Sequence, residues 1–152
     1  MPTEVILIAA TTIDGFIARH SLEVTSWSED LHLFKEQTMG HPIIMGSNTF
    51  KTLSNELVGR EMIVVSRSQE PQDVLANISS ARCFVVGGGK TYCRFIDHIT
   101  DIYITPHPYV FGKGVPLFDG KISKEPILEF KNIIEVDSGR GIFQYQYEVI
   151  RK

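Results

Sequence analysis

Short uninterrupted runs of apolar residues are the clearest pattern along this chain. Runs of this kind, bounded by polar or glycine-rich turns, are typical of strands that are buried on both faces of a parallel sheet. The stretch after position 140 instead alternates between apolar and polar residues, as in a strand with one face in water. The predicted buried strands are 5–10, 42–45, 62–65, 83–86 and 102–105, and the predicted half-exposed strand is 141–150.

Helices are predicted where apolar residues recur every three or four positions. Ser26 and Glu29 have the spacing of a capping box at the start of the first helix. The recurring positions are Trp27, Leu31, Phe34 and Thr38 in the first helix, and Tyr92, Phe95, Ile96 and Ile99 in the second. Strands that alternate with helices pair in parallel through crossovers, whereas a C-terminal third made of strands implies antiparallel pairing. We therefore expect an α/β fold with three layers, α/β/α, around a central mixed, mostly parallel sheet that ends in a C-terminal antiparallel hairpin.

Composition narrows the function classes. The length of 152 residues suits a single domain spanning 1–152, and 15 Lys and Arg against 18 Asp and Glu give a net charge of −3. This balance lacks the positive surplus of nonspecific nucleic-acid binding, and the longest apolar run, 5–10, is far shorter than a membrane span. Cys83, Cys93 and the five histidines show no metal-ligand or nucleophile pattern. We expect a cytoplasmic, metal-independent monomer that acts on small molecules.

Asp30 is the residue that the pattern singles out for chemistry. It lies three residues after Trp27 and four before Phe34, on the predicted inward face of the first helix. The alternative is a first-turn acid that stabilises the helix dipole. Because Glu29 already fills the capping-box position, we favour the inward interpretation. A carboxyl group beside two aromatic rings loses water, which raises its pKa and suits it to bind a cationic, proton-accepting heterocycle.

Three predicted strand ends carry residues that suit bound phosphates. They are Gly87-Gly88-Gly89, Gly46-Ser47-Asn48-Thr49 and Ser66-Arg67-Ser68. Glycines and hydroxyls at such turns let backbone N–H groups approach an anion, although each turn alone is also compatible with a plain tight turn. Three of them at one edge of a parallel sheet favour a ligand with several phosphates, such as NADPH, with Arg67 facing a ribose 2′-phosphate.

A series of short segments occurs along the chain in a recognisable order. They are Leu7-Ile8-Ala9-Ala10, Trp27 with Asp30-Leu31-x-x-Phe34-Lys35-x-x-Thr38, Pro42-Ile43-Ile44-Met45-Gly46-x-x-Thr49-Phe50, Gly59-Arg60, Val86-Gly87-Gly88-Gly89-x-x-Tyr92 and Ile102-Tyr103-Ile104-Thr105. In this order and with these spacings, these segments resemble the dihydrofolate reductase family over nearly the whole chain. The resemblance implies a dihydrofolate reductase-like fold and the NADPH-dependent reduction of 7,8-dihydrofolate to 5,6,7,8-tetrahydrofolate, a step of one-carbon metabolism. It also implies a cis peptide between Gly87 and Gly88.

The resemblance further implies roles for single residues. Asp30 would bind the pterin and promote its protonation through water, with Trp27 and Thr105 completing the catalytic group. Arg60, which is otherwise an ordinary surface arginine, would hold the glutamate α-carboxylate. Ser47 stands where many members have a basic residue, which leaves Arg67 with more of the preference for NADPH. The other substrate-binding residues would be Ile8, Ala10, Leu31, Phe34, Leu53 and Leu57, and the cofactor-binding residues Ala10, Ile17, Gly46, Asn48, Thr49, Ser66, Arg67, Gly87, Gly88, Gly89 and Tyr92.

Two other functions stay open from the sequence. The segments Ile13-Asp14-Gly15-Phe16-Ile17-Ala18 and Gly112-Lys113-Gly114-Val115-Pro116-Leu117-Phe118 look more like the riboflavin-biosynthesis reductase domain, which shares the fold and NADPH but reduces a ribosylated aminopyrimidine phosphate. The third interpretation is a noncatalytic nucleotide-binding module. An inward carboxylate argues against it, because burying a charge destabilises a fold that does not use it.

Overall fold

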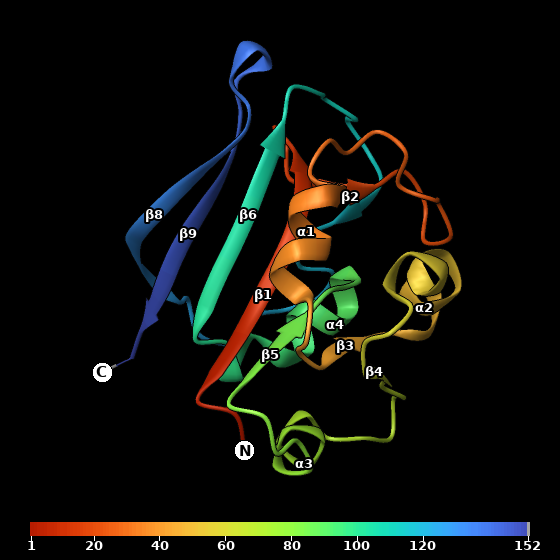
Figure 1. The fold of residues 1–152 in the computed structure, drawn as a ribbon, viewed down its shortest axis with the longest axis vertical. Coiled ribbons are helices and arrows are strands. Elements are labelled where there is room, and N and C mark those ends of the chain that lie inside the picture. The colour runs from red at the N-terminus through yellow and green to blue at the C-terminus, as the bar shows by residue number, and fades with distance from the viewer. Residues whose placement is uncertain (152) are drawn as a thin grey trace.

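Strands and helices alternate through the first two thirds of the chain, and strands predominate thereafter (Figure 1). The computed structural model describes residues 1–151, in which no helix is long and apolar enough to cross a membrane. The strands are β1 (Glu4–Thr12), β2 (Phe16–Ala18), β3 (Ile43–Met45), β4 (Met62–Val64), β5 (Arg82–Val85), β6 (Asp101–His107), β7 (Val115–Pro116), β8 (Ile127–Asp137) and β9 (Ile142–Ile150). The helices are α1 (Leu31–Thr38), α2 (Ser47–Leu53), α3 (Pro71–Ala76) and α4 (Gly89–Phe95), with 3-10 turns at Ser54–Leu57, Ile96–His98 and Ser138–Arg140.

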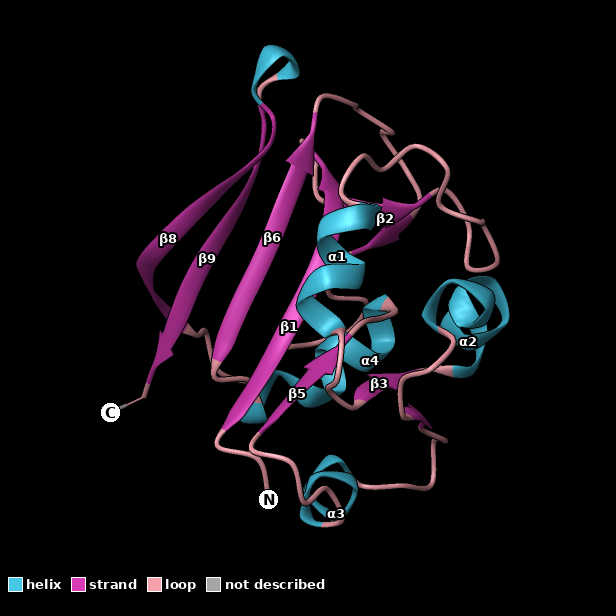
Figure 2. Cartoon of the chain, viewed as in Figure 1, coloured by secondary structure: helices cyan, strands magenta, loops and turns pink. Residues whose placement is uncertain are grey.

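Seven strands form one mixed sheet in the order β4-β3-β5-β1-β6-β9-β8. Neighbours from β4 to β6 pair in parallel, whereas β9 pairs antiparallel with both β6 and β8. Figure 2 shows these strands as one layer, with the β8–β9 hairpin at its edge. A separate two-stranded antiparallel sheet joins β2 to β7. The mixed, mostly parallel sheet and the C-terminal hairpin are thus confirmed.

The central strand β1 divides the apolar core into two halves. Val5 and Leu7 pack on the face that carries α3 and α4, whereas Ile6 and Ile8 pack on the face that carries α1 and α2. This division follows from the alternation of side chains along a strand. Because both faces are covered, β1 is apolar at every position from 5 to 10, and the expected three layers are present.

The strands β2, β7 and β8 have neither a continuous apolar run nor a regular alternation, and the sequence does not locate them. The short strands β2 and β7 are half-buried, and most of β8 is exposed. The outer strand β8 also contains two register shifts, between Phe130 and Asn132 and between Glu135 and Asp137. These irregularities interrupt the alternation from which a strand is predicted.

The first helix begins later than the sequence suggested. α1 starts at Leu31, so the prediction of a capping box at Ser26 and Glu29 is wrong. The Ser26 N–H donates to the carbonyl of Val24 in the preceding loop. The Glu29 N–H donates to Nε2 of His107 at 2.9 Å, at the end of β6. A partner from a distant strand has therefore replaced the local cap.

Trp27 accordingly lies before α1, and its position is set by aromatic packing. Its ring meets His107, Tyr109 and Phe111 edge to face, with centroid distances of 5.3, 6.2 and 5.4 Å. The carboxylate of Glu29 forms an ion pair with Arg140 at 2.8 Å. The start of α1 is thus held by the segment that follows β6 and by the tip of the β8–β9 hairpin.

Candidate active site

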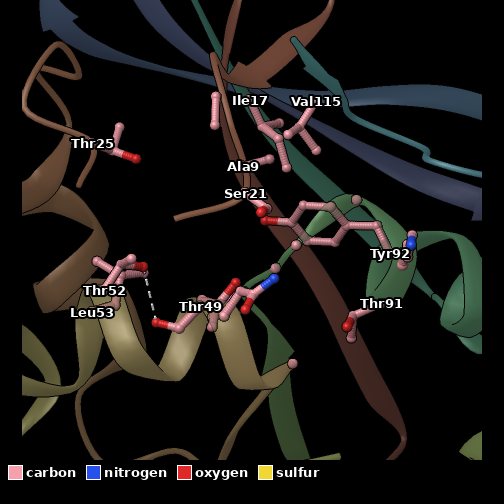
Figure 3. Close-up of a pocket in the computed structure, with 18 of the residues that line it drawn as sticks. Ala9, Ile17, Ser21, Thr25, Thr49, Thr52, Leu53, Thr91, Tyr92 and Val115 are labelled. Atoms are coloured by element: carbon pink, nitrogen blue, oxygen red, sulfur yellow. Dashed lines mark hydrogen bonds between the residues drawn. The ribbon is translucent and has the colours of Figure 1, made fainter. Parts of the chain in front are cut away.

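A cleft of about 430 Å³ opens where β1, β3 and β5 reach their carboxyl ends. Ligands of open α/β sheets bind at this kind of edge. Figure 3 shows Thr49, Thr52 and Leu53 of α2 on one side of the cleft and Thr91 and Tyr92 of α4 on another. The predicted site residues that line the cleft are Ile8, Ala10, Ile17, Asp30, Leu31, Phe34, Gly46, Asn48, Thr49, Leu53, Arg67, Gly87, Gly88, Gly89 and Tyr92.

Asp30 occupies the N-cap position of α1 and is only 6% exposed. Its side chain caps no N–H of the helix and instead contributes to the cleft wall. Burial raises the pKa of Asp30; a positive charge on His107, whenever that imidazole is protonated, and the Thr105 hydroxyl oppose this effect without cancelling it. The carboxyl group therefore stays protonated to a higher pH than an exposed aspartate does, and in that form it is a hydrogen-bond donor.

Trp27 and Thr105 lie behind the cleft wall rather than on it. Both are buried, and Nε1 of Trp27 and Oγ1 of Thr105 make no hydrogen bond of normal geometry within residues 1–151. Buried polar atoms without partners are rare. Trp27 is close enough to Glu23 to lower the pKa of that carboxyl group. Thr105 is close enough to Asp30 to affect its pKa, so this unsatisfied hydroxyl adjoins the buried acid.

The turn between β5 and α4 forms the opposite wall of the cleft. The Gly87–Gly88 peptide is cis, as the family resemblance implied. The Gly46 N–H donates to the Gly87 carbonyl at 2.9 Å, which joins the end of β3 to this turn. A Cβ atom on Gly89 would lie 2.5 Å from the carbonyl oxygen of Pro116. Glycine is therefore required where the segment around β7 closes against α4.

Tyr92 connects this turn to the central strand. Its hydroxyl donates to the carbonyl of Ile8 at 2.6 Å. Burial raises the pKa of Tyr92, and the charge of Asp30 adds to the effect. Tyr92 is therefore a neutral donor that holds the end of β1 against α4.

Two arginines bring positive charge to the outer part of the cleft. Arg67 lines it from the turn after β4, as expected, and Arg94 of α4 lines it as well. Arg94 donates to the Ser66 carbonyl at 3.1 Å and to the Gln69 carbonyl. Ser66 is itself outside the cleft wall, and its hydroxyl bonds to that of Ser68 at 3.0 Å. Arg94 thus holds the turn that carries Arg67, and sequence reasoning missed it because its partners are main-chain atoms of a distant segment.

Leu57 and Arg60 lie away from the cleft wall. Leu57 is fully buried in the core beneath α2 instead of lining the cleft. The Arg60 guanidinium donates to the Thr38 hydroxyl at 3.0 Å, to the Lys35 carbonyl at 2.6 Å and to the Val58 carbonyl at 3.5 Å. An arginine has five N–H donors, so two remain for other acceptors.

The loop between β2 and α1 supplies residues that sequence reasoning also missed. Ser21, Glu23, Thr25 and Ser28 line the cleft, and Figure 3 shows Ser21 and Thr25 facing the cavity. The loop is tethered by Arg19, whose guanidinium pairs with Glu23 at 2.7 Å. No periodic pattern marks these polar residues, because an irregular loop positions them.

Solved structures with the same architecture include a dihydrofolate reductase and a putative riboflavin biosynthesis protein. A dihydrofolate reductase from Enterococcus faecalis, complexed with NADP(H) and RAB-propyl, superposes with a TM-score of 0.75 at 17% identity over 99% of both chains. A putative riboflavin biosynthesis protein from Shewanella sp. PV-4 superposes with a TM-score of 0.74 at 20% identity, over 97% of this chain and 99% of that one. At these identities the likeness establishes the fold, and it confirms the predicted fold class.

Sequence comparison then identifies the family. Dihydrofolate reductase type 3 of Salmonella typhimurium is 30% identical over 111 residues, which are 65% of this chain and 68% of that protein. Dihydrofolate reductase of Bacillus subtilis (strain 168) is 33% identical over 104 residues, which are 59% of this chain and 62% of that protein. Residues 4–110 match the family model described as dihydrofolate reductase. The chain is an enzyme of the oxidoreductase class. It belongs to the dihydrofolate reductase family, which confirms the resemblance seen in the sequence.

The burial of Asp30 predicts how stability depends on pH. Because the pKa of Asp30 is higher in the folded chain than its unfolded value of about 3.9, the folded state binds more protons between these two values. The free energy of unfolding should therefore fall as the pH rises through that window. Asp30→Asn removes the titrating group, so the variant should match the wild type below pH ~4 and be the more stable protein at neutral pH.

Urea unfolding of both proteins at a series of pH values measures this difference. Asp73→Asn, on the exposed side of α3, is the matched control and should show no pH-dependent gain. A constant difference between Asp30→Asn and the wild type at every pH would contradict the assignment of a raised pKa.

Proposed function

We propose that this enzyme reduces 7,8-dihydrofolate to 5,6,7,8-tetrahydrofolate with NADPH. The observation that carries the proposal is the placement of a buried acid, Asp30, in the same cleft as the Gly87-Gly88-Gly89 turn. One wall then suits a heterocycle that must gain a proton, and the other suits a dinucleotide. The names of the sequence relatives and the NADP(H) complex of the Enterococcus faecalis enzyme support this choice.

Asp30 has two roles in the proposed reaction. It binds the 2-amino group and a ring nitrogen of the pterin, with the unsatisfied Thr105 hydroxyl as a further partner. It also promotes protonation of the pterin N5 through a water, because its raised pKa keeps a proton available in a partly water-excluded site. When bound, NADPH supplies the hydride that completes the reduction.

The substrate side of the cleft is apolar next to Asp30. Leu31 and Phe34 project from α1 and Leu53 from α2, which suits a flat aromatic ring system. Arg60 is the proposed partner of the glutamate α-carboxylate. Its three hydrogen bonds hold the guanidinium still, and its two remaining N–H donors are available for a carboxylate.

The residues of the cofactor side fit a phosphorylated dinucleotide. The ends of β3 and β5 open on the cleft through Gly46 and the triple glycine, which add no side chain of their own to the main chain there. Arg67 and Arg94 place two positive charges at the outer end, as a ribose 2′-phosphate requires. Positive charge is therefore concentrated locally in a chain whose net charge is −3.

We also propose that the enzyme is a cytoplasmic monomer without nucleic-acid or membrane partners. The outer strand β8 exposes Phe130 at its edge, but its two register shifts and the charges of Glu129 and Lys131 disfavour pairing with another strand.

A second candidate function is reduction of a ribosylated aminopyrimidine phosphate, as in riboflavin biosynthesis. It is favoured by the contact between the two segments that resemble that reductase domain. The Asp14 carboxylate accepts N–H bonds from Phe111 at 3.2 Å and Gly112 at 2.8 Å, and the Leu117 N–H donates to the Gly15 carbonyl at 3.0 Å. The match to the Shewanella sp. PV-4 protein over 97% of this chain supports the same candidate.

Following NADPH absorbance separates the two candidates. With dihydrofolate present, the proposed function predicts NADPH oxidation that an antifolate abolishes. Binding of NADPH without turnover of dihydrofolate would contradict the proposal and favour the pyrimidine reductase.

In the active enzyme, Asp30→Asn should retain NADPH affinity but lose about two orders of magnitude or more in turnover, the scale of acid catalysis. Full turnover by Asp30→Asn would overturn the role of Asp30, and Glu36→Gln, an exposed acid on α1, is the control.

Arg67→Ala tests the assignment of the cofactor. Only NADPH carries the 2′-phosphate, so the substitution should weaken NADPH roughly tenfold or more and leave the weaker binding of NADH nearly unchanged. Fluorescence titration with each cofactor measures both affinities. Arg82→Ala, which removes an arginine paired with Glu4 at the other end of the sheet, should change neither. An equal loss for NADPH and NADH would contradict the role of Arg67.

A further inference from the structure

His107 is a buried histidine whose two ring nitrogens are both engaged by main-chain atoms. It is the last residue of β6 and is 1% exposed. Its Nδ1 lies 2.8 Å from the Thr105 carbonyl oxygen, and its Nε2 lies 2.9 Å from the Glu29 amide nitrogen. The residue after Glu29 is Asp30, so the imidazole is hydrogen-bonded to the main chain immediately before the buried acid.

These two contacts specify the protonation state of the ring. A carbonyl oxygen only accepts hydrogen bonds, so Nδ1 carries a proton. An amide N–H only donates, so Nε2 is unprotonated and the imidazole is neutral. A proton on Nε2 would place two N–H groups against each other at 2.9 Å, and the Glu29 amide would lose its acceptor.

Asp30 is consequently held by main-chain hydrogen bonds on both sides. The Glu29 N–H before it donates to His107, and its own carbonyl accepts the Phe34 N–H at 2.9 Å in the first turn of α1. These two bonds fix the main chain on either side of Asp30 and so the position from which its side chain starts. His107 is also close enough to Asp30 that a positive charge on the imidazole would lower the pKa of the Asp30 carboxyl group.

We infer that His107 is a positioning residue for Asp30: its neutral imidazole, held between the Thr105 carbonyl and the Glu29 amide, fixes the start of α1 and leaves the proton of this buried pair on the Asp30 carboxyl. The inference rests on the proposed function only in making Asp30 the group that delivers the proton. The Glu29 amide blocks the one ring nitrogen that would otherwise take that proton. In this arrangement Asp30 is the acid and His107 keeps it in place.

The other groups around the imidazole do not compete with this arrangement. The Glu29 carboxylate is paired with Arg140 at 2.8 Å, and Arg140 also donates to the Tyr109 hydroxyl at 2.9 Å. Trp27 contacts the ring edge to face at 5.3 Å and carries no charge. Asp30 is thus the titratable neighbour of His107 that has no ion pair of its own within residues 1–151.

NMR of the free enzyme tests the inference without any substrate. With ¹⁵N-labelled histidine, the imidazole of His107 should show a protonated Nδ1 and an unprotonated Nε2. It should keep this state throughout the titration of Asp30, which is measured in parallel by ¹³C labelling of the Asp30 carboxyl group. His107→Gln keeps an acceptor for the Glu29 amide but cannot become a cation, so the midpoint of the Asp30 titration should be unchanged. Spectra of His107→Gln and Asp30→Asn assign the two signals.

A charged pair would give a different result in the same titration. If the pair were an imidazolium next to a carboxylate, His107→Gln would remove a neighbouring positive charge and raise the Asp30 midpoint by about one unit or more. That shift, or a proton found on Nε2 at neutral pH, would overturn the inference. His32→Gln, on the exposed side of α1, is the matched control and should leave the Asp30 titration unchanged.

Dihydrofolate turnover supplies a second readout. His107→Phe removes the acceptor of a buried amide, and we expect a loss of roughly tenfold in turnover together with an altered pH profile. His107→Gln should restore both. Wild-type turnover in His107→Phe, or failure of His107→Gln to restore turnover, would overturn the positioning role. If the enzyme does not reduce dihydrofolate at all, the proposed function fails, but the NMR measurement still decides the state of His107.

Discussion

The pairing of β1 with β5 on one side and β6 on the other is the constraint on which the rest of the structure depends. β1 is buried on both faces, so each of its main-chain N–H and C=O groups must be satisfied by a neighbouring strand. The resulting register places Leu7 beside Val85 and Ala10 beside Thr105. The glycine turn after β5 and the buried end of β6 are thereby brought to the same edge of the sheet, and the cleft forms between them.

At that edge the two walls differ in their electrostatics. Asp30 lies on one side in an environment that favours its neutral form, and the other side combines open main chain with Arg67 and Arg94. Neither wall needs a broad charged patch, which agrees with a net charge of −3. The proposed reaction uses this difference, because a pterin must be protonated on one side while a polyanionic dinucleotide is held on the other.

Structural features were predicted correctly from the sequence where they depend on residues that are close together along the chain. The strands that became β1, β3, β4, β5, β6 and β9 were located because burial on a pleated face leaves a run or an alternation of apolar residues. The inward position of Asp30 was found for a related reason, since it precedes an amphipathic helix. The start of that helix was misplaced at Ser26, because the capping-box spacing recurs by chance and the actual partner of Glu29 belongs to another strand.

By itself, the sequence determined the layered α/β architecture, the glycine turn at the end of β5 and the presence of an acid at the entrance to α1. These features depend on residues that are neighbours along the chain, so local patterns record them. Only the tertiary structure decided that the Glu29 amide meets His107, that Arg94 holds the turn carrying Arg67, and that Arg60 is tied to the end of α1. Each of these contacts joins segments far apart in the sequence through single main-chain atoms, which every residue possesses, and the sequence therefore carries no mark of which ones will pair.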